Sequence, residues 1–299
     1  MKEKLKNFCK SIGIEYVGIA SPGPYLELQK ILEDRINKGF YTGFEEKELK
    51  KRIYPEITMP DVKSIIVCLF PYYVGYSNDT NISNYTYARD YHLIVKEKLI
   101  NIGEFLRENI EGFNYMAFVD TGPLVDRYLA YLAGLGFWGI NTHIINDKYG
   151  SYVFIGYLMV DYEFEFDTPH DRTCIQCGSC IRNCPGGAIL GGFEIDPRRC
   201  VSYLTQKKGE LSEEEKGCIR NNGHSVFGCD ICQKVCPHNM NKEHTNMEEF
   251  KKDLIYKLNY DELNSISNKE FKRRYGDRAF SWRGRTIIVR NFEYLMDDK

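Results

Sequence analysis

A run of cysteines beyond the middle of the chain constrains its fold more than any other feature. Four cysteines with the spacing C-x2-C-x2-C-x3-C-P occupy residues 174–185, and a second group with the spacing C-x2-C-x3-C-P occupies residues 229–237. In bacterial ferredoxins this spacing places cysteine thiolates around 4Fe–4S clusters, and the fourth cysteine of the run binds the other cluster. The pattern therefore predicts a module that transfers single electrons.

Two such clusters need eight thiolates, and the two motifs supply seven. Cys200 lies between the motifs and is the predicted eighth ligand, although Cys218 lies in the same interval and competes with it. Paired C-x2-C motifs also bind zinc, but a zinc site takes four ligands at two knuckles and has no C-x2-C-x2-C-x3-C-P run. The expected ligands are Cys174, Cys177, Cys180 and Cys236 for one cluster, and Cys184, Cys200, Cys229 and Cys232 for the other.

The composition excludes some classes of protein. The chain has 299 residues, 43% hydrophobic and 27% charged, which suffices for two modest domains or one large one. A formal net charge of −2 argues against a globally basic nucleic-acid binder, but not against a local basic patch. The charged N-terminal segment is unlike a signal peptide, and the apolar runs are too short for a membrane span. With cysteines in cluster spacings, we expect a cytoplasmic protein with no membrane association.

Helical and strand periodicities alternate along the first half of the chain. The predicted helices cover residues 2–11, 24–37, 45–52, 90–109 and 124–133, and the predicted strands cover 16–20, 62–70, 115–119 and 152–160. This pattern predicts an α/β domain over residues 1–165, a ferredoxin-like module over 166–242 and a helical, basic tail over 243–299. Residues 134–139 match G-x-G-x-x-G, but they follow a predicted helix, so we expect a helix end and a tight turn rather than a dinucleotide site.

Asp120 is the candidate catalytic acid. It follows the predicted strand 115–119 and precedes Thr121-Gly122-Pro123, so that its carboxylate can reach a cleft. Burial there would raise its pKa and let it deliver a proton, whereas a turn or helix cap is the competing interpretation. Arg127, one turn into the next helix, is either an anion contact or a surface charge.

Several further segments resemble one known family, that of epoxyqueuosine reductase, a cobalamin-dependent iron–sulfur enzyme of queuosine synthesis. The resemblance runs over nearly the whole chain. The segments that carry it are 87–92, 119–127, 133–142, 149–152, 200–206, 228–237 and 280–285. It implies an α+β protein in which a nitroreductase-like α/β domain holds cobalamin against the two-cluster module.

The resemblance also implies a reaction and its partners. The clusters would reduce the cobalt, and reduced cobalamin would remove the epoxide oxygen from epoxyqueuosine in tRNA. A ferredoxin or flavodoxin would be a fitting electron donor. Asp120 matches the family's proton donor, and the expected cobalamin contacts are Arg52, Asp120, Arg127 and Asn141.

The sequence departs from the family at its end. Typical members continue after the Trp-Arg-Gly-Arg segment into a helical-repeat domain that helps to grip tRNA, whereas this sequence stops at Lys299, so the resemblance is to a short form. Residues 269–290 hold eight Lys/Arg against two acids. These basic side chains either meet phosphates or form a solvated helix face.

Two alternative functions remain: a dehalogenase-like corrinoid reductase of small molecules, and a plain two-cluster electron carrier. The domain before the cysteines argues against the carrier.

Overall fold

The computed structural model describes residues 1–296 and divides into two compact units. Unit 1 comprises Met1–Pro71, His92–Gly139 and His143–Ile175. Unit 2 comprises Tyr72–Tyr91, Ile140–Thr142 and the described part of Gln176–Lys299. The predicted domains were continuous in sequence, whereas the units interleave. Unit 2 includes the tail and the cysteine-rich region from Gln176 onward, while Cys174 belongs to unit 1. Among the described residues, no helix is both long and apolar enough to cross a membrane.

Unit 1 is built on a four-stranded sheet with the order β1-β2-β6-β3. Its strands are β1 (Tyr16–Ala20), β2 (Ser64–Pro71), β6 (Val153–Val160) and β3 (Tyr115–Val119). All three pairings are antiparallel. Every residue of β2 is buried because this strand is internal and both faces of the sheet are covered. The antiparallel sheet confirms the α+β class.

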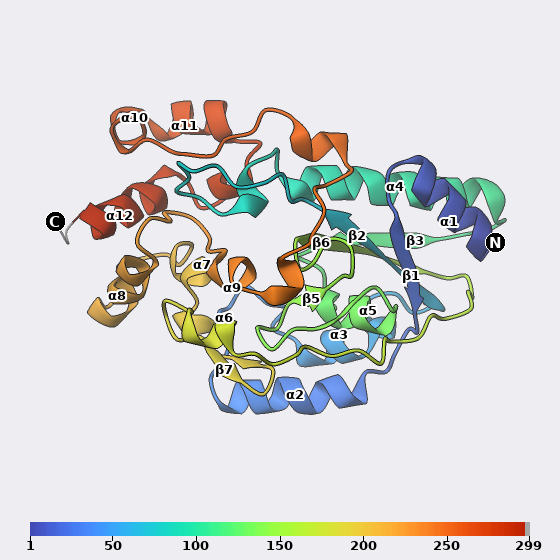
Figure 1. Ribbon diagram of the computed structural model, residues 1–299. Coiled ribbons are helices and arrows are strands. Elements are labelled where there is room, and N and C mark those ends of the chain that lie inside the picture. Colours follow the sequence, from blue (N-terminus) through green and yellow to red (C-terminus); the bar gives the residue numbers. More distant parts are fainter. Residues whose placement is uncertain (297–299) are drawn as a thin grey trace. The chain divides into compact units, whose positions relative to one another are not determined.

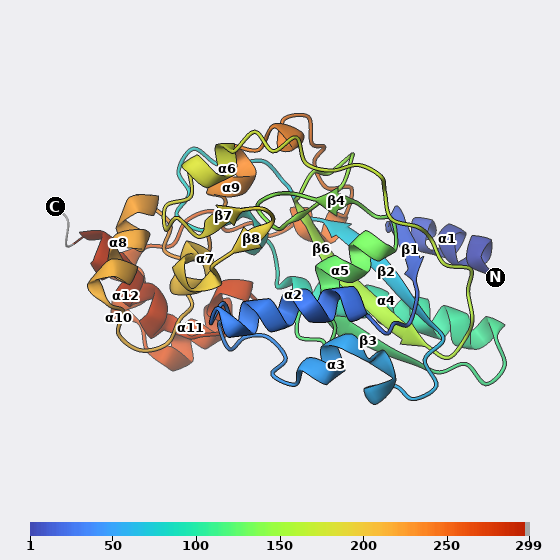
Figure 2. The same ribbon diagram turned by 90° about the horizontal axis from the view of Figure 1, so that it is seen from below.

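Helices cover both faces of this sheet (Figures 1 and 2). α1 (Lys2–Ser11) and α4 (Tyr91–Asn109) lie on one face, and α2 (Leu26–Asn37), α3 (Leu49–Ile53) and α5 (Asp126–Leu132) lie on the other. A short 3-10 helix, η1 (Pro55–Ile57), follows α3. Gly156 permits the approach of α4, since a Cβ there would lie 2.7 Å from Val95 Cγ1. The apolar stripe of α4 is thereby buried against the sheet.

The predicted elements of unit 1 are confirmed, most of them to within two residues. The helix predicted at 45–52 is the exception, because it begins only at Leu49. Its first residues form a turn in which the Glu45 carboxylate accepts hydrogen bonds from the backbone N–H groups of Thr42 and Gly43. Gly134, with φ +66°, ends α5 before the hairpin of β4 (Phe137–Trp138) and β5 (Ile144–Ile145). The G-x-G-x-x-G run is therefore a helix end and turn, as predicted.

Unit 2 consists of short elements around the cysteines and a helical end. The helices are α6 (Ser179–Arg182), α7 (Val201–Leu204), α8 (Glu213–Asn222), α9 (Ile231–Lys234), α10 (Tyr260–Ser265), α11 (Asn268–Tyr275) and α12 (Arg285–Met296). A hairpin pairs β7 (Ile189–Gly191) with β8 (Glu194–Ile195). The 3-10 helices are η2 (Asn84–Thr86), η3 (Pro197–Arg199), η4 (Pro237–Asn239), η5 (Glu248–Lys251) and η6 (Ala279–Ser281). Phe227, Phe271 and Phe280 share one hydrophobic core, so the tail packs with the cysteine-rich region.

Backbone pairing explains why residues 72–91 belong to unit 2. The Asn81 side chain donates to the Leu258 carbonyl and accepts from the Leu258 N–H, both at 2.9 Å. The Ser83 N–H donates to the Phe227 carbonyl at 2.9 Å. An asparagine amide has a donor and an acceptor like those of a peptide group. The Asn81 side chain therefore pairs with Leu258 as a backbone group of a neighbouring strand would. This segment is consequently fixed beside the second cysteine motif.

Candidate active site and iron–sulfur ligands

Asp120 lies at the C-terminal end of β3 in a strained backbone conformation. Its φ of +57° is in the left-handed region, which costs a non-glycine residue about 1–3 kcal/mol. A hydrogen bond fixes the loop that follows Asp120: the Leu124 N–H donates to the Tyr157 hydroxyl at 3.2 Å. A Cβ on Gly122 would collide with the same hydroxyl, so the loop requires glycine there. Strain held by its surroundings in this way is typical of functional loops.

The Asp120 carboxylate is exposed, contrary to the burial that would have raised its pKa. Its side chain is 60% exposed, and its Oδ2 lies 3.4 Å from Nε2 of His92. The buried carboxylate belongs to Asp126 at the start of α5. Burial, and then the negative charge of Asp120, raise the pKa of Asp126 well above its usual range, while Arg127 opposes the shift. The sequence pattern did not predict that His92 and Asp126 lie beside Asp120, because both residues lie outside its turn.

Two of the predicted cofactor contacts lie near each other in unit 1. Burial lowers the pKa of Arg52, Glu45 raises it, and the positive charges of Arg35 and Arg127 lower it further. Three guanidinium groups and two carboxylates, those of Glu45 and Glu46, therefore share a neighbourhood. An anionic group there would relieve the repulsion among the arginines. Arg52 and Arg127 were predicted, whereas Arg35 and Glu45 were missed because no motif connects them to this site.

Asn141, the remaining predicted contact, belongs to unit 2, whereas Arg52 and Arg127 belong to unit 1. Its side chain is buried, and Nδ2 donates to the backbone carbonyl of Cys232 at 3.5 Å. The segment that follows β4 therefore supports the second cysteine motif directly.

Four of the predicted cluster ligands are gathered in unit 2. Burial raises the pKa of the Cys229 thiol to about 12, and the negative charges of Cys200, Asp230 and Cys184 add to the shift. Burial raises the pKa of Cys232 well above its usual range, with further contributions from Cys229, Cys200 and Cys184. Cys200 acts on both of these thiols, whereas Cys184 also raises the pKa of Cys218. These contacts favour Cys200 as the fourth ligand, and the choice between it and Cys218 stays a prediction.

These four thiols fit an iron–sulfur cluster. Four neighbouring thiolates repel one another, and iron supplies the positive charge that makes their ionisation favourable. The Ala188 N–H already points at Cys184 Sγ at 3.2 Å. Within residues 1–296, no three His, Cys, Asp or Glu side chains are close enough together to hold a single metal ion. Ligands of a four-iron cube stand farther apart, because each thiolate binds a different iron.

The other predicted ligand group differs in its surroundings. Cys174, Cys180 and Cys236 are buried, whereas Cys177 is exposed. A hydrogen bond between the Cys177 and Ser179 side chains, and then one with the Ser179 backbone, lower the pKa of Cys177, and the Arg182 charge lowers it further. α6, which carries Cys180, packs against α9 within unit 2.

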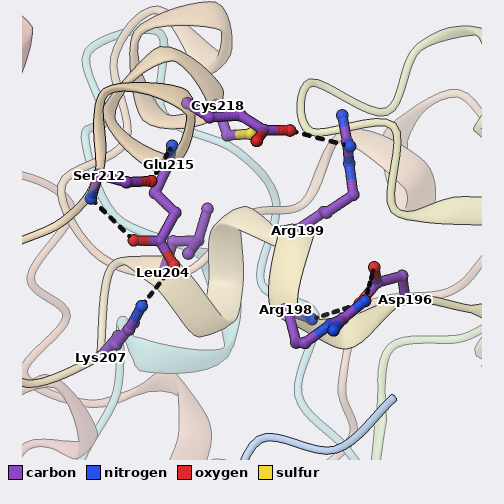
Figure 3. A pocket seen from close by; sticks show the side chains of 9 residues that line it. Asp196, Arg198, Arg199, Leu204, Lys207, Ser212, Glu215 and Cys218 are labelled. Carbon is purple, nitrogen blue, oxygen red and sulfur yellow. Dashed lines mark hydrogen bonds and ion pairs between the residues drawn. The ribbon is translucent and has the colours of Figure 1, made fainter. Parts of the chain in front are cut away.

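The cysteines outside the ligand groups are buried. Cys9 and Cys68 are completely buried in unit 1, and a hydrogen bond between their side chains raises the pKa of Cys68. Cys218 lies in unit 2 on the wall of a cavity of about 440 Å³ (Figure 3). The charged groups of that cavity are paired with one another, as Arg198 is with Asp196 and Arg199 with Glu214. The cavity thus presents no net charge to a ligand.

Most charges of the basic segment 269–290 hold the fold of unit 2. Arg273 and Arg274 pair with Glu270. Arg285 donates to the carbonyls of residues 263 and 264, and Arg290 donates to those of residues 204, 207 and 209. An exposed patch remains at Trp282, whose Nε1 donates to Gln206 at 2.9 Å. The segment is therefore not a plain solvated helix face, and its contact with phosphates stays a prediction.

Comparisons with known proteins identify relatives of both regions. A family of 4Fe–4S double cluster binding domains matches residues 173–239, and a domain described as epoxyqueuosine reductase QueG matches residues 52–121. The epoxyqueuosine reductase of Bacillus cereus is 34% identical over 97% of this chain and 78% of its own length.

Two solved structures are also similar. An epoxyqueuosine reductase structure from Bacillus subtilis, with its catalytic aspartate loop swung out of the active site, matches with a TM-score of 0.89 at 32% identity. A crystal structure of epoxyqueuosine reductase with an epoxyqueuosine-modified tRNA-Tyr stem loop matches with a TM-score of 0.91 at 32% identity. Each covers 99% of this chain and 80% of the matched chain.

Proposed function

Because this chain belongs to the epoxyqueuosine reductase family, we propose that it reduces epoxyqueuosine in tRNA to queuosine. The reaction breaks both C–O bonds of the epoxide, consumes two electrons and two protons, forms a C=C bond and releases the oxygen as water. The two 4Fe–4S clusters would pass electrons one at a time to cobalamin, which, when bound, would supply them to the substrate at low potential. The coincidence of Asp120 with a strained loop, in a chain 34% identical to a named reductase, carries the proposal.

Asp120 is the proposed proton donor to the leaving oxygen. Its carboxylate is accessible, and it stands on a loop whose backbone is fixed by Tyr157 and Gly122. His92 Nε2, 3.4 Å away, is placed to return a proton to the carboxylate after each turnover. The protein's part in the chemistry is thus to hold one proton at Asp120 Oδ2.

Arg52 and Arg127 are the proposed contacts for the anionic phosphate of the cobalamin tail, with Arg35 adding positive charge. Asp120 and Asn141 complete the proposed set of cofactor contacts. A small acidic electron carrier, such as a flavodoxin or ferredoxin, is the proposed donor, and the exposed Cys177 side of the module is the natural place of entry. A tRNA substrate and thiolate-held clusters support a reaction in the cytoplasm.

The proposal is tested with anaerobically reconstituted protein, cob(II)alamin and an epoxyqueuosine-modified tRNA stem loop. We expect about eight irons per chain, a changed cob(II)alamin EPR spectrum and formation of queuosine. Asp120→Asn should lower the single-turnover rate by about 10²–10⁴-fold per cobalamin-loaded enzyme. The matched control, Asp61→Asn, changes an exposed carboxylate of unit 1 and should keep the full rate.

The other outcomes identify the alternatives. If cobalamin binds but the RNA is not reduced, the chain is a corrinoid reductase of another substrate. If the clusters form and cobalamin stays free, the chain is an electron carrier. If Asp120→Asn keeps the wild-type rate, the proton comes from another group.

A further inference from the structure

A buried amide beside one cluster ligand is left with half of its hydrogen bonds unmade. Asn222 is the last residue of α8, and Gly223, with φ +81°, ends the helix directly after it. The Asn222 side chain is 5% exposed, and its Oδ1 accepts a weak hydrogen bond from Cys229 Sγ at 3.8 Å. Its Nδ2 is buried and has no partner among the described residues. A buried donor left unpaired in this way costs about 1–3 kcal/mol.

The arrangement changes when Cys229 binds iron. A thiolate has no proton to donate, so the Asn222 oxygen would then face a negatively charged sulfur without a hydrogen bond. Rotation of the amide by half a turn exchanges its oxygen and nitrogen, which occupy nearly the same shape. The unpaired Nδ2 then points at the Cys229 sulfur. One rotation therefore removes a repulsion and satisfies the buried donor.

We propose that Asn222 donates a hydrogen bond to the Cys229 thiolate in the cluster-loaded protein and raises the reduction potential of that cluster. The proposal rests on the assignment of Cys184, Cys200, Cys229 and Cys232 as its ligands. A hydrogen bond to a ligating sulfur withdraws negative charge, and it stabilises the reduced cluster more than the oxidised one because the reduced cluster carries one more negative charge.

The surroundings give this hydrogen bond its importance. Burial and the mutual repulsion of the thiolates oppose negative charge in this group, and the Asp230 carboxyl lies beside it. Each additional electron on the cluster is opposed by the same factors. In the structure, the Asn222 oxygen accepts from Cys229 Sγ at 3.8 Å and the Ser179 hydroxyl accepts from Cys177 Sγ at 3.5 Å. Each of these side chains can donate to the same sulfur once the sulfur is a thiolate. Each cluster would thus have its own potential-setting side chain.

This parallel provides a matched pair of variants. Asn222→Leu removes the donor at similar volume, Asn222→Asp replaces it with an acceptor of the same shape, and Ser179→Ala removes the donor of the other group. Each protein is reconstituted without cobalamin or RNA, its iron content is measured, and both clusters are titrated by EPR-monitored reduction. Because no substrate is involved, failure of this test leaves the proposed reaction untouched.

We expect both Asn222 variants to lower one of the two midpoint potentials and leave the other unchanged, with the larger shift in Asn222→Asp. Ser179→Ala should lower only the other potential. Unchanged or raised potentials in fully loaded Asn222 variants would overturn the proposal. A second measurement needs no substitution: in protein labelled with 15N-asparagine, pulsed EPR of the reduced cluster should detect an asparagine nitrogen across the hydrogen bond. The absence of that coupling would equally overturn it.

Discussion

Replacing Asn291 with leucine should loosen the hold of α12 on the cluster-bearing part of unit 2. Asn291 is completely buried, and its Nδ2 donates to the carbonyls of Thr205 at 2.7 Å and Val226 at 2.9 Å. Leucine has a similar volume but leaves both carbonyls without this donor. At about 1–3 kcal/mol for each unpaired buried group, the two together cost about 2–6 kcal/mol.

The loss should be visible in thermal unfolding. A unit of this size loses about 2–4 °C of Tm per kcal/mol, so the Tm of Asn291→Leu should fall by roughly 10 °C. Circular dichroism and cluster absorbance, recorded anaerobically on the loaded protein, report the unfolding and the release of iron. Thr286→Ala, an exposed change on the same helix, is the control and should stay within about 0.5 kcal/mol of the wild type. Equal Tm values for Asn291→Leu and this control would refute the reasoning.

Two further predictions concern cysteine ligation and pH. Cys200→Ala should lower the iron content from about eight per chain to about four, whereas Cys218→Ala should keep about eight; equal iron loss in both would contradict the ligand assignment. The pKa of Asp126 is raised by burial in the folded state, so its stabilising contribution is complete below about pH 4 and is lost as the pH rises through the folded-state pKa. Asp126→Asn should therefore be more stable than the wild type at neutral pH, by a margin that shrinks as the pH falls. Anaerobic melts from about pH 5.5 to about pH 8 check this, and a margin that grows on acidification would contradict it.

The sequence was a good guide to local structure. The strands 16–20 and 115–119 have the predicted bounds, because alternation and β-branched residues are local signals. The cysteine spacing likewise predicted the cluster module, since ligand geometry imposes the spacing on the chain itself. The order of the strands, and the pairing of Asn81 with Leu258, depend on contacts between distant residues and leave no periodic trace.

The active-site electrostatics could not be predicted for a related reason. The position of Asp120 after a strand was correct, but its exposure depends on how the loop turns at φ +57°. Burial raises the pKa of Asp126, which looks like an ordinary helix-start residue in the sequence. Counting favoured Cys200 over its competitor Cys218, and the thiols that interact with Cys200 in the fold support that prediction.

The interleaving of the two units has a consequence during synthesis. Asn81 and its partner Leu258 are 177 residues apart in the chain. At about 5–20 residues per second, the segment 72–91 waits roughly 10–35 s for the residues that pair with it. By then the last strand of the sheet, which ends at Val160, has long been made. A nascent chain therefore carries a complete first unit and an unpaired loop before its second unit can close.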